Sequence, residues 1–374
     1  MAQRAVARLA TKLDAIKGTG RTIEIGEELR HLTLQVISEA LMGLTPEESD
    51  ETFAKVYMPI VVEGHMRVWN PAREFCPLLP GWWSHRRNTQ RLNSFITGVI
   101  RRRWSLIQEV GVLKVVGVGG GAGGGGQGWA GETVLGSRRR QDILDKVLGS
   151  LEPGEWGTAA VRQIRDEMKT FVLAGHETSA SMLNWALYEL SRNGELHDKV
   201  VAESEAVFGR CASLTAPLPS VESLRELTLS EACLREALRK YSVVPLVVRK
   251  CVEATTISGG GDGKDHTLPR GTIVMLMIKG VHERPDVWPE PLDFKPERFL
   301  SDVKPYTFLP FIDGPRNCLG QHLSLLESKV VLSLLLNRYK FTLTNQNAGV
   351  ANRWIIPTIS LNGTHFSVEA RTTG

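Results

Sequence analysis

The sequence predicts a mainly α fold of the α+β class, in which small β-sheets accompany a large set of helices. Apolar residues recur at three- and four-residue spacing through most of the first 240 residues, which is typical of amphipathic helices. Short segments rich in β-branched residues then follow, and others end the chain after a last helical pattern. Because strands and helices do not alternate, the order favours α+β over a parallel α/β sheet.

The predicted helices follow one another closely. The first two apolar stripes cover residues 5–16 and 25–42, and Thr45-Pro-Glu-Glu has the acidic first turn of a helix start. Later helical patterns cover residues 142–150, 160–193, 195–208, 220–240 and about 319–336.

Two segments interrupt this pattern. Residues 66–85 contain three prolines and the pair Trp82-Trp83, which indicates a loop whose aromatic rings pack on a core or form a lid, with membrane contact as the alternative. Residues 111–131 are glycine-rich, and such a stretch buries too little side chain to stay ordered. We expect a disordered insertion there, since no Gly-Lys-Ser or Gly-Lys-Thr ending makes it a phosphate-binding loop.

Short strands are predicted where β-branched residues lie between turn signals. Residues 246–252, 255–258 and 272–277 are separated by a glycine run and a Pro-Arg-Gly turn, which indicates a small sheet. Three more segments of this kind end the chain, at residues 340–343, 358–361 and 365–368.

Composition argues against several classes of protein. The net charge of +4 is mild for 374 residues, and the basic triplets at 101–103 and 138–140 lack interleaved aromatic residues, so we expect a solvated surface and no nucleic-acid partner. Five scattered cysteines without CxxC spacing favour a reducing compartment over a disulfide framework or a zinc site. The apolar stretch 330–336 is too short to cross a bilayer, and no signal peptide opens the chain.

One cysteine has a distinctive setting. Residues 311–320 read Phe-Ile-Asp-Gly-Pro-Arg-Asn-Cys-Leu-Gly, directly before the last helical pattern. A helix start and a nearby arginine favour a thiolate at Cys318, and Gly314 and Gly320 are expected to adopt dihedral angles that other residues avoid. The alternative is that Cys318 is a small buried hydrophobic residue, as free cysteines commonly are.

This decapeptide resembles the haem-binding signature of the cytochrome P450 family. The resemblance implies a P450-like helical fold and haem b (iron protoporphyrin IX) as cofactor, with Cys318 as the proximal ligand of the iron. It also implies that Arg316 holds a haem propionate, that Phe311 packs beside the sulfur, and that Gly314 and Gly320 belong to the cofactor-binding loop.

A second motif, Ala174-Gly175-His176-Glu177-Thr178-Ser179, lies in a helical pattern that is apolar on nearly every face. The Thr178 hydroxyl can bond the carbonyl of Ala174, bending the helix and opening a groove. The motif resembles the oxygen-activating motif of the same family, which implies catalytic roles for Thr178 and Glu177 and places Ala174 near the cofactor. The alternative is a close helix crossing built from small residues.

Further resemblances concern stability and the substrate. Glu236, Arg239 and Arg298 match the order of the family's ExxR pair and later arginine, which form a buried structural charge triad. By the same resemblance Arg249 is a second propionate ligand. Residues with apolar side chains are expected to face the substrate, namely Phe171, Val244, Leu246 and Ile355.

These resemblances imply one P450-like domain over residues 1–374 that lacks the family's usual N-terminal region. They imply a monooxygenase that inserts one oxygen atom from O2 into a small apolar substrate of lipid, terpenoid, sterol or carotenoid type. Its electrons would come from an NADPH-dependent reductase or a ferredoxin, and its location would be membrane-associated, at the endoplasmic reticulum or a plastid. The alternatives are a haem-thiolate enzyme that rearranges hydroperoxides and a non-catalytic haem-binding remnant.

Overall fold

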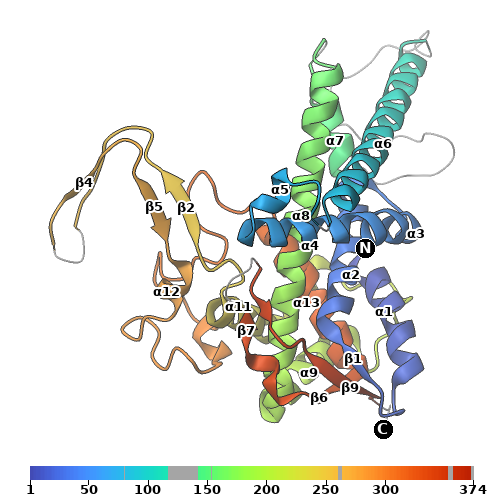
Figure 1. Cartoon of the computed structure of the whole chain (residues 1–374). Helices are drawn as coiled ribbons and strands as arrows, with labels where there is room; N and C mark the ends of the chain where they lie inside the picture. The colour runs from blue at the N-terminus through green and yellow to red at the C-terminus, as the bar shows by residue number, and fades with distance from the viewer. Residues whose placement is uncertain (80, 117–141, 153, 260–262, 353–356, 372–374) are drawn as a thin grey trace, which may run out of the picture. The chain divides into compact units, whose positions relative to one another are not determined.

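The computed structural model describes residues 1–79, 81–116, 142–152, 154–259, 263–352 and 357–371. These residues form two compact units, one from residues 31–176 and the other from residues 2–30 and 177–374, apart from Met1. Helices predominate in both, with short strands confined to the second unit (Figure 1). The mainly α prediction is therefore confirmed.

The regular elements among the described residues of the first unit are all helices. It contains the end of α2 (Ile25–Met42) and the beginning of α8 (Thr158–Arg192). Between them lie α3 (Pro46–Ser49), the π-helix η1 (Asp50–Tyr57), α4 (Met58–Trp69), α5 (Ala72–Phe75), α6 (Trp82–Val116) and α7 (Ile143–Gly149). Thr45 caps α3 through a capping box with Glu48, as the Thr45-Pro-Glu-Glu pattern predicts.

The core of the first unit joins apolar faces of α2, η1, α6 and α8, including Leu34, Ile37, Phe53, Ile96, Met168 and Val172. Arg103 is buried, although we expected its basic triplet at the surface. Its guanidinium donates to Asp142 at 2.8 Å, to Asp145 at 2.6 Å and to the carbonyl of Met42 at 3.1 Å. This buried cation therefore joins α2, α6 and α7.

The two segments that were expected to interrupt the helices, residues 66–85 and 111–131, differ from expectation. The expected loop at 66–85 contains the end of α4, all of α5 and the start of α6, and Trp83 is exposed rather than packed in a core. α6 continues to Val116, six residues into the range expected to be a disordered insertion. The rest of that insertion, residues 117–131, lies outside the described residues.

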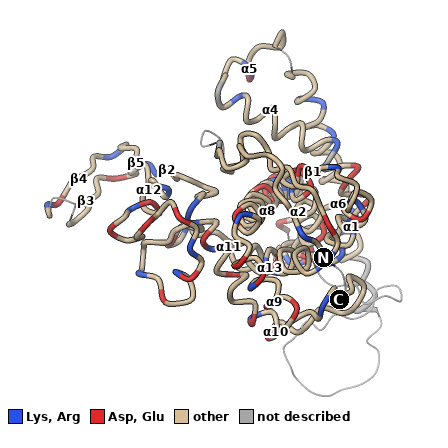
Figure 2. The backbone as a smooth tube through the Cα atoms, turned by 90° about the horizontal axis from the view of Figure 1, so that it is seen from below, with Lys and Arg blue, Asp and Glu red and all other residues tan. Residues whose placement is uncertain are grey.

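The second unit contains the other helices. They are α1 (Ala2–Ile16), α9 (Gly194–Phe208), α10 (Val221–Arg225), α11 (Thr228–Tyr241), α12 (Ile278–His282), the 3-10 helices η2 (Pro296–Phe299) and η3 (Gln346–Gly349), and α13 (Gln321–Arg338). α13 packs against α1, α9 and α11, and its residues 327–337 are all buried. Basic and acidic residues are interspersed along the helices around it (Figure 2).

The described residues of this unit also form four small antiparallel sheets. β1 (Thr22–Glu24), β9 (His365–Ala370) and β6 (Tyr339–Leu343) form one sheet, in which Glu24 lies opposite His365. The other pairs are β2 (Val247–Lys250) with β5 (Ile273–Leu276), β3 (Thr255–Ile257) with β4 (His266–Leu268), and β7 (Ala351–Asn352) with β8 (Ile359–Ser360). The sequence indicated most of these strands but not β1, β4 and β7, which have two or three residues each.

Candidate functional site

The loop that carries Cys318 is closed by its own backbone. The amide N–H of Cys318 donates to the carbonyl of Phe311 at 2.9 Å, and that of Asn317 donates to the carbonyl of Gly314 at 3.0 Å. Gly314 has a φ of +80°, which glycine adopts without strain. The Cys318 side chain is exposed, two residues before the N-cap of α13, so the buried-hydrophobe alternative does not describe it.

Gly320 contradicts the expectation of an unusual backbone. Its φ of −86° and ψ of 3° lie in a region that other residues also occupy. A Cβ added at this position would lie 3.9 Å from the Cys318 sulfur. The expectation is therefore wrong about the dihedral angles, and a Cβ at position 320 would make an ordinary contact with the sulfur.

The acid-threonine segment of α8 is held against the helix that follows Cys318. The hydroxyls of Ser179 and Ser324 form a hydrogen bond of 2.9 Å. Ser324 lies in the first turn of α13, and its N–H donates to the carbonyl of Gly320 at 2.8 Å. Segments 145 residues apart in sequence are thereby joined directly beside the cysteine loop.

Glu177, Thr178 and Ser179 face different directions, because successive residues of a helix are rotated by about 100°. Ser179 faces α13, whereas Glu177 lines a cavity together with Ala180, Ser181 and Asn184. Thr178 lies between these two faces and is half-buried. α8 is α-helical throughout this segment, and the proposed bond from Thr178 to the Ala174 carbonyl stays a prediction.

The preceding residues of α8 belong to the first unit and serve packing. A Cβ added at Gly175 would lie 2.7 Å from a side-chain carbon of Ile37, so α2 approaches α8 more closely than alanine would permit. The Thr33 hydroxyl donates to the carbonyl of His176 at 2.9 Å, and the His176 ring packs edge-on against Tyr57. The close helix crossing that we considered as an alternative therefore describes Gly175.

Glu236, Arg239 and Arg298 are brought together in the second unit. Arg239 donates to both carboxylate oxygens of Glu236 at 2.7 Å, and both side chains are 0% exposed. Arg298 Nε lies 3.4 Å from Glu236 Oε1. The backbone N–H of Lys295 also donates to Glu236, at 2.9 Å.

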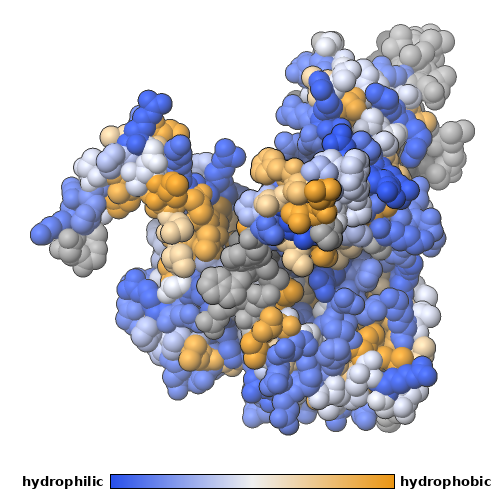
Figure 3. Space-filling model, in the orientation of Figure 1, coloured by the Kyte–Doolittle hydropathy of each residue, from blue (hydrophilic) through white to orange (hydrophobic). Residues whose placement is uncertain are grey.

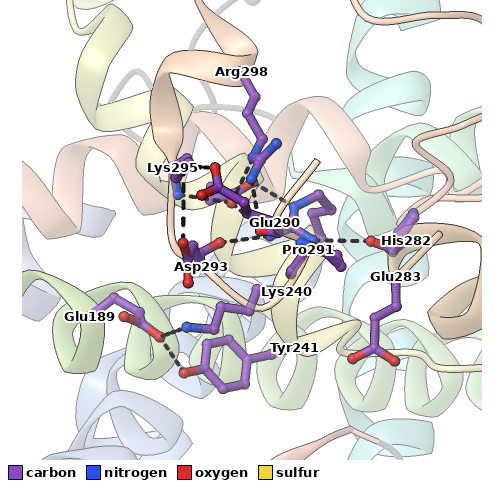
Figure 4. A network of polar contacts seen from close by, with 12 residues as sticks. Glu189, Lys240, Tyr241, His282, Glu283, Glu290, Pro291, Asp293, Lys295 and Arg298 are labelled. Carbon is purple, nitrogen blue, oxygen red and sulfur yellow. Dashed lines mark hydrogen bonds and ion pairs between the residues drawn. The ribbon is translucent and has the colours of Figure 1, made fainter. Parts of the chain in front are cut away.

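Each of the five side-chain N–H groups of Arg239 donates to an acceptor. Besides its two bonds to Glu236, the guanidinium donates to the carbonyls of Pro291 at 2.8 Å and of His282 and Asp293 at 3.0 Å (Figure 4). A guanidinium has five donors in a fixed planar array. The match fixes the chain path of residues 282–298 around one buried cation.

His282 links this network to the segment before Cys318, a role with no signal in the sequence. Its Nε2 accepts from the N–H of Leu309 at 2.9 Å, and its Nδ1 lies 3.0 Å from the Ser242 hydroxyl. Burial, helped by the charges of Arg239 and Lys279, lowers the pKa of His282 to about 3. The ring is therefore neutral at physiological pH, so its Nε2 is free to accept.

The other predicted site residues are dispersed. Arg316 is exposed in the cysteine loop, and Arg249 is exposed on β2, where it donates to the carbonyl of Val248. Val244 and Leu246 are half-buried before β2, and Phe311 is half-buried in the cysteine loop. Phe171 and the exposed Ala174 lie in the first unit, and Ile355 lies outside the described residues.

Apolar side chains are also exposed in the second unit. On β2 and β5 they are Val248, Ile273, Met275 and Leu276, a group visible in Figure 3. Leu319 and Leu323 are exposed and lie close to Cys318 in the sequence, before and in the first turn of α13.

The described part of the chain holds no cluster of three or more His, Cys, Asp or Glu residues suited to a metal ion. The donor available at Cys318 is therefore a single thiol with apolar neighbours.

Comparison with known proteins identifies the class. The family model described as cytochrome P450 matches residues 1–354, so the chain belongs to the cytochrome P450 family. Cytochrome P450 4c21 of Blattella germanica is 29% identical over 348 residues, which is 90% of this chain and 64% of the relative. Cytochrome P450 4V2 of Homo sapiens is 31% identical over 261 residues, covering 69% and 45%.

A shorter match has higher identity: cytochrome P450 4d8 of Drosophila melanogaster is 38% identical over 210 residues, covering 55% of this chain and 44% of the relative. The chain thus spans less than two thirds of these relatives. The crystal structure of the cytochrome P450DA heme domain superposes with a TM-score of 0.74 at 22% identity, covering 99% of this chain and 72% of that chain. This structural match shows the P450 fold.

Family membership implies a haem cofactor, and the residues fit one. Haem iron takes four ligands from the porphyrin, so one axial thiolate from the protein suffices, and Cys318 is an exposed single thiol. Leu319 and Leu323, which follow Cys318 closely in the sequence, are exposed apolar side chains. Within the described residues, no helix is long and apolar enough to cross a membrane.

Proposed function

We propose that the chain carries the catalytic site of a haem-thiolate monooxygenase that inserts one oxygen atom from O2 into an apolar substrate. The observation that supports it most directly is the Ser179–Ser324 bond. It joins the acid-threonine segment of α8 to the helix that starts beside Cys318. Family members that rearrange hydroperoxides commonly lack the acid-threonine pair, so Glu177 and Thr178 favour the monooxygenase.

The roles of the residues follow from their chemistry. Cys318 would hold the haem iron, and Arg316 and Arg249 would bind its propionates as guanidinium donors. Bound haem supplies the activation of O2, which amino-acid side chains cannot perform. Thr178 would donate a hydrogen bond from α8, and Glu177 would hold a proton at its carboxyl oxygen. Val244, Leu246, Phe171 and Ile355 would provide apolar contact for the substrate.

The proposal includes partners and location. A monooxygenase of this type takes two electrons per turnover from an NADPH-dependent reductase or a ferredoxin. Phe75, Leu78 and Trp83 are exposed around α5 and the start of α6, and such apolar side chains support peripheral contact with a membrane surface of the endoplasmic reticulum or a plastid.

Carbon monoxide binding and oxygen consumption test the function. The expressed holoprotein, reduced under carbon monoxide, should give the red-shifted Soret band of a thiolate-ligated haem, and should consume O2 with NADPH and a reductase. A normal band without NADPH-dependent O2 consumption would support the hydroperoxide rearrangement instead. A protein without bound haem would support the non-catalytic remnant.

Thr178→Ala is expected to lower product formed per NADPH roughly ten- to hundred-fold, while the carbon monoxide spectrum stays unchanged. The loss follows because a positioned hydrogen-bond donor or proton-transfer group commonly contributes rate factors of this order or larger. Electrons that do not reach the product should appear as hydrogen peroxide. Thr178→Ser keeps the hydroxyl and should stay close to the parent chain. Equal coupling in the alanine and serine variants would exclude the role proposed for this hydroxyl.

A further inference from the structure

A polar cavity of about 330 Å³ in the second unit shares no residue with the cavity beside Glu177. It is lined by α9, by the loop that follows α9, and by β6 and β9, which lie near one another in Figure 1. Its ionisable lining residues are His197, Asp198, Arg210, Lys340, Glu369 and Arg371. None of them belongs to the candidate functional site, so the cavity is free for another role.

The walls of this cavity are tied to one another by side chains at the end of α13. The Asn337 side chain donates to the carbonyl of Gly209 at 2.9 Å and accepts from the N–H of Ala212 at 2.7 Å. Arg338 donates to the carbonyl of Ala212 at 2.8 Å, and its own carbonyl accepts from the N–H of Arg371 at 2.8 Å. The loop after α9 and the end of β9 are therefore held on one frame.

The loop after α9 presents Arg210 in a constrained turn. Gly209 has a φ of +78° and Cys211 a φ of +49°, so Arg210 lies between two residues with positive φ. Such a conformation is uncommon for a residue with a side chain, and it persists only where surrounding contacts hold it. The Cys211 thiol supplies one contact by donating to the carbonyl of Arg371 at 3.3 Å. Arg210 is thereby held beside the end of the strand that Arg371 follows.

Three cations line the cavity, one from each of three places in the fold: Arg210 in the loop, Lys340 on β6 and Arg371 after β9. The side chains of Lys340 and Arg371 form no ion pair with any described residue. Arg210 Nε lies 3.8 Å from the carboxylate of Glu205, which is longer than a hydrogen bond. These three cations therefore retain most of their capacity to donate to an anion.

The two carboxylates of the lining do not neutralise the cations. Asp198 lies 3.0 Å from Nδ1 of His197, on α9. Glu369 lies opposite Lys340 in the register of β6 and β9, yet the two side chains form no ion pair. Three cations against two carboxylates leave the lining with an excess of positive charge, and a concave surface of this kind attracts anions.

We propose that this cavity binds a phosphate group, with the guanidinium groups of Arg210 and Arg371 and the ammonium group of Lys340 as its donors. Phosphate carries about two negative charges at pH 7, and guanidinium groups match its oxygens. Its tetrahedral oxygens can meet donors from three elements, whereas a carboxylate offers two oxygens in one plane. The volume is about ten times the roughly 30 Å³ of a water molecule, which leaves room for a small ester group.

The first test titrates the full chain with inorganic phosphate in a calorimeter, at constant ionic strength because salt screens exposed charges. The parent chain should bind phosphate saturably. Lys340→Met should weaken binding about ten-fold, as expected for a lost hydrogen bond to a charged group. The double variant Lys340→Met/Arg371→Gln should lose the saturable heat. No saturable heat with the parent chain, or equal affinity in the double variant, excludes the site.

A matched lysine provides the control. Lys250→Met also removes an exposed lysine from a strand of the second unit, but Lys250 lies on β2 and does not line the cavity. It should bind phosphate as the parent chain does. A loss in Lys250→Met as large as that in Lys340→Met would show that only the overall charge matters, and the site would be excluded.

Glu369→Gln tests the charge of the lining in the opposite direction. It removes the carboxylate that lies opposite Lys340, so phosphate should bind about two- to five-fold more tightly. A variant with a damaged fold cannot gain affinity in this way, which makes the result independent of folding defects. Unchanged or weaker binding, with a normal circular dichroism spectrum, would contradict the assignment.

Two further ligands identify what is recognised. Glycerol phosphate that binds more tightly than inorganic phosphate would assign the cavity to a phosphate ester, and equal or weaker binding would assign it to free phosphate. Acetate that binds as tightly as phosphate would exclude a phosphate site. None of these measurements uses haem or turnover, so they stand or fall separately from the monooxygenase.

Discussion

Cys318→Ala and Cys318→Ser are expected to abolish the red-shifted Soret band of the reduced carbon monoxide complex completely, and with it NADPH-dependent substrate oxidation. Only a thiolate donates enough electron density to the iron to produce this band and to favour O–O cleavage. Serine nearly preserves the size of the side chain but not the sulfur, so it separates ligation from packing. The measurement is the difference spectrum of purified protein at equal concentration.

A second cysteine provides the control. Cys251→Ala changes a half-buried cysteine in the same unit that is not part of the 311–320 loop, and should keep the full band. Retention of the thiolate band in Cys318→Ser would mean that another sulfur binds the iron, and the assignment of Cys318 would be wrong. Loss of the band in both the Cys251 and Cys318 variants would indicate a general folding defect instead of lost ligation.

The candidate site residues could be proposed from the sequence because their signals are local. The residues around Cys318 occupy ten consecutive positions, and Gly314 was expected to have unusual dihedral angles because a tight loop needs them, which its φ of +80° bears out. The same reasoning failed for Gly320, because a glycine in a sequence pattern does not reveal its own dihedral angles. Its φ of −86° and ψ of 3° are open to other residues, and a Cβ there would lie 3.9 Å from the Cys318 sulfur.

Contacts between distant segments were beyond reach of the sequence. The Ser179–Ser324 bond joins two ordinary helical serines, and the bond from Leu309 to His282 uses a lone histidine with no motif. β1 escaped detection because its three residues acquire strand geometry only by pairing with β9, more than 300 residues later. Local propensity is a weak guide wherever tertiary pairing decides the structure.

Arg239→Ala is expected to lower the free energy of unfolding by about 3–5 kcal/mol, because it leaves the Glu236 carboxylate buried without its main partner. Glu236 and Arg239 are both 0% exposed, and the three carbonyls of residues 282, 291 and 293 would lose a donor as well. Domains of this kind are commonly stable by about 5–15 kcal/mol, so such a loss is a large fraction of the total. Urea unfolding followed by circular dichroism measures it.

Charge alone does not explain the expected loss, and two variants show why. Arg239→Lys keeps the positive charge but offers three donors in place of five, so it cannot reach both Glu236 oxygens and all three carbonyls, and should fall between the parent chain and Arg239→Ala. Lys199→Ala breaks a pair of similar length, 2.6 Å to Glu195, that is exposed on α9, and should leave the urea midpoint unchanged. If Arg239→Ala unfolds at the same urea concentration as Lys199→Ala, the guanidinium does not organise residues 282–298. The position of the cysteine loop would then depend on other contacts, with the bond between His282 and Leu309 as the next to test.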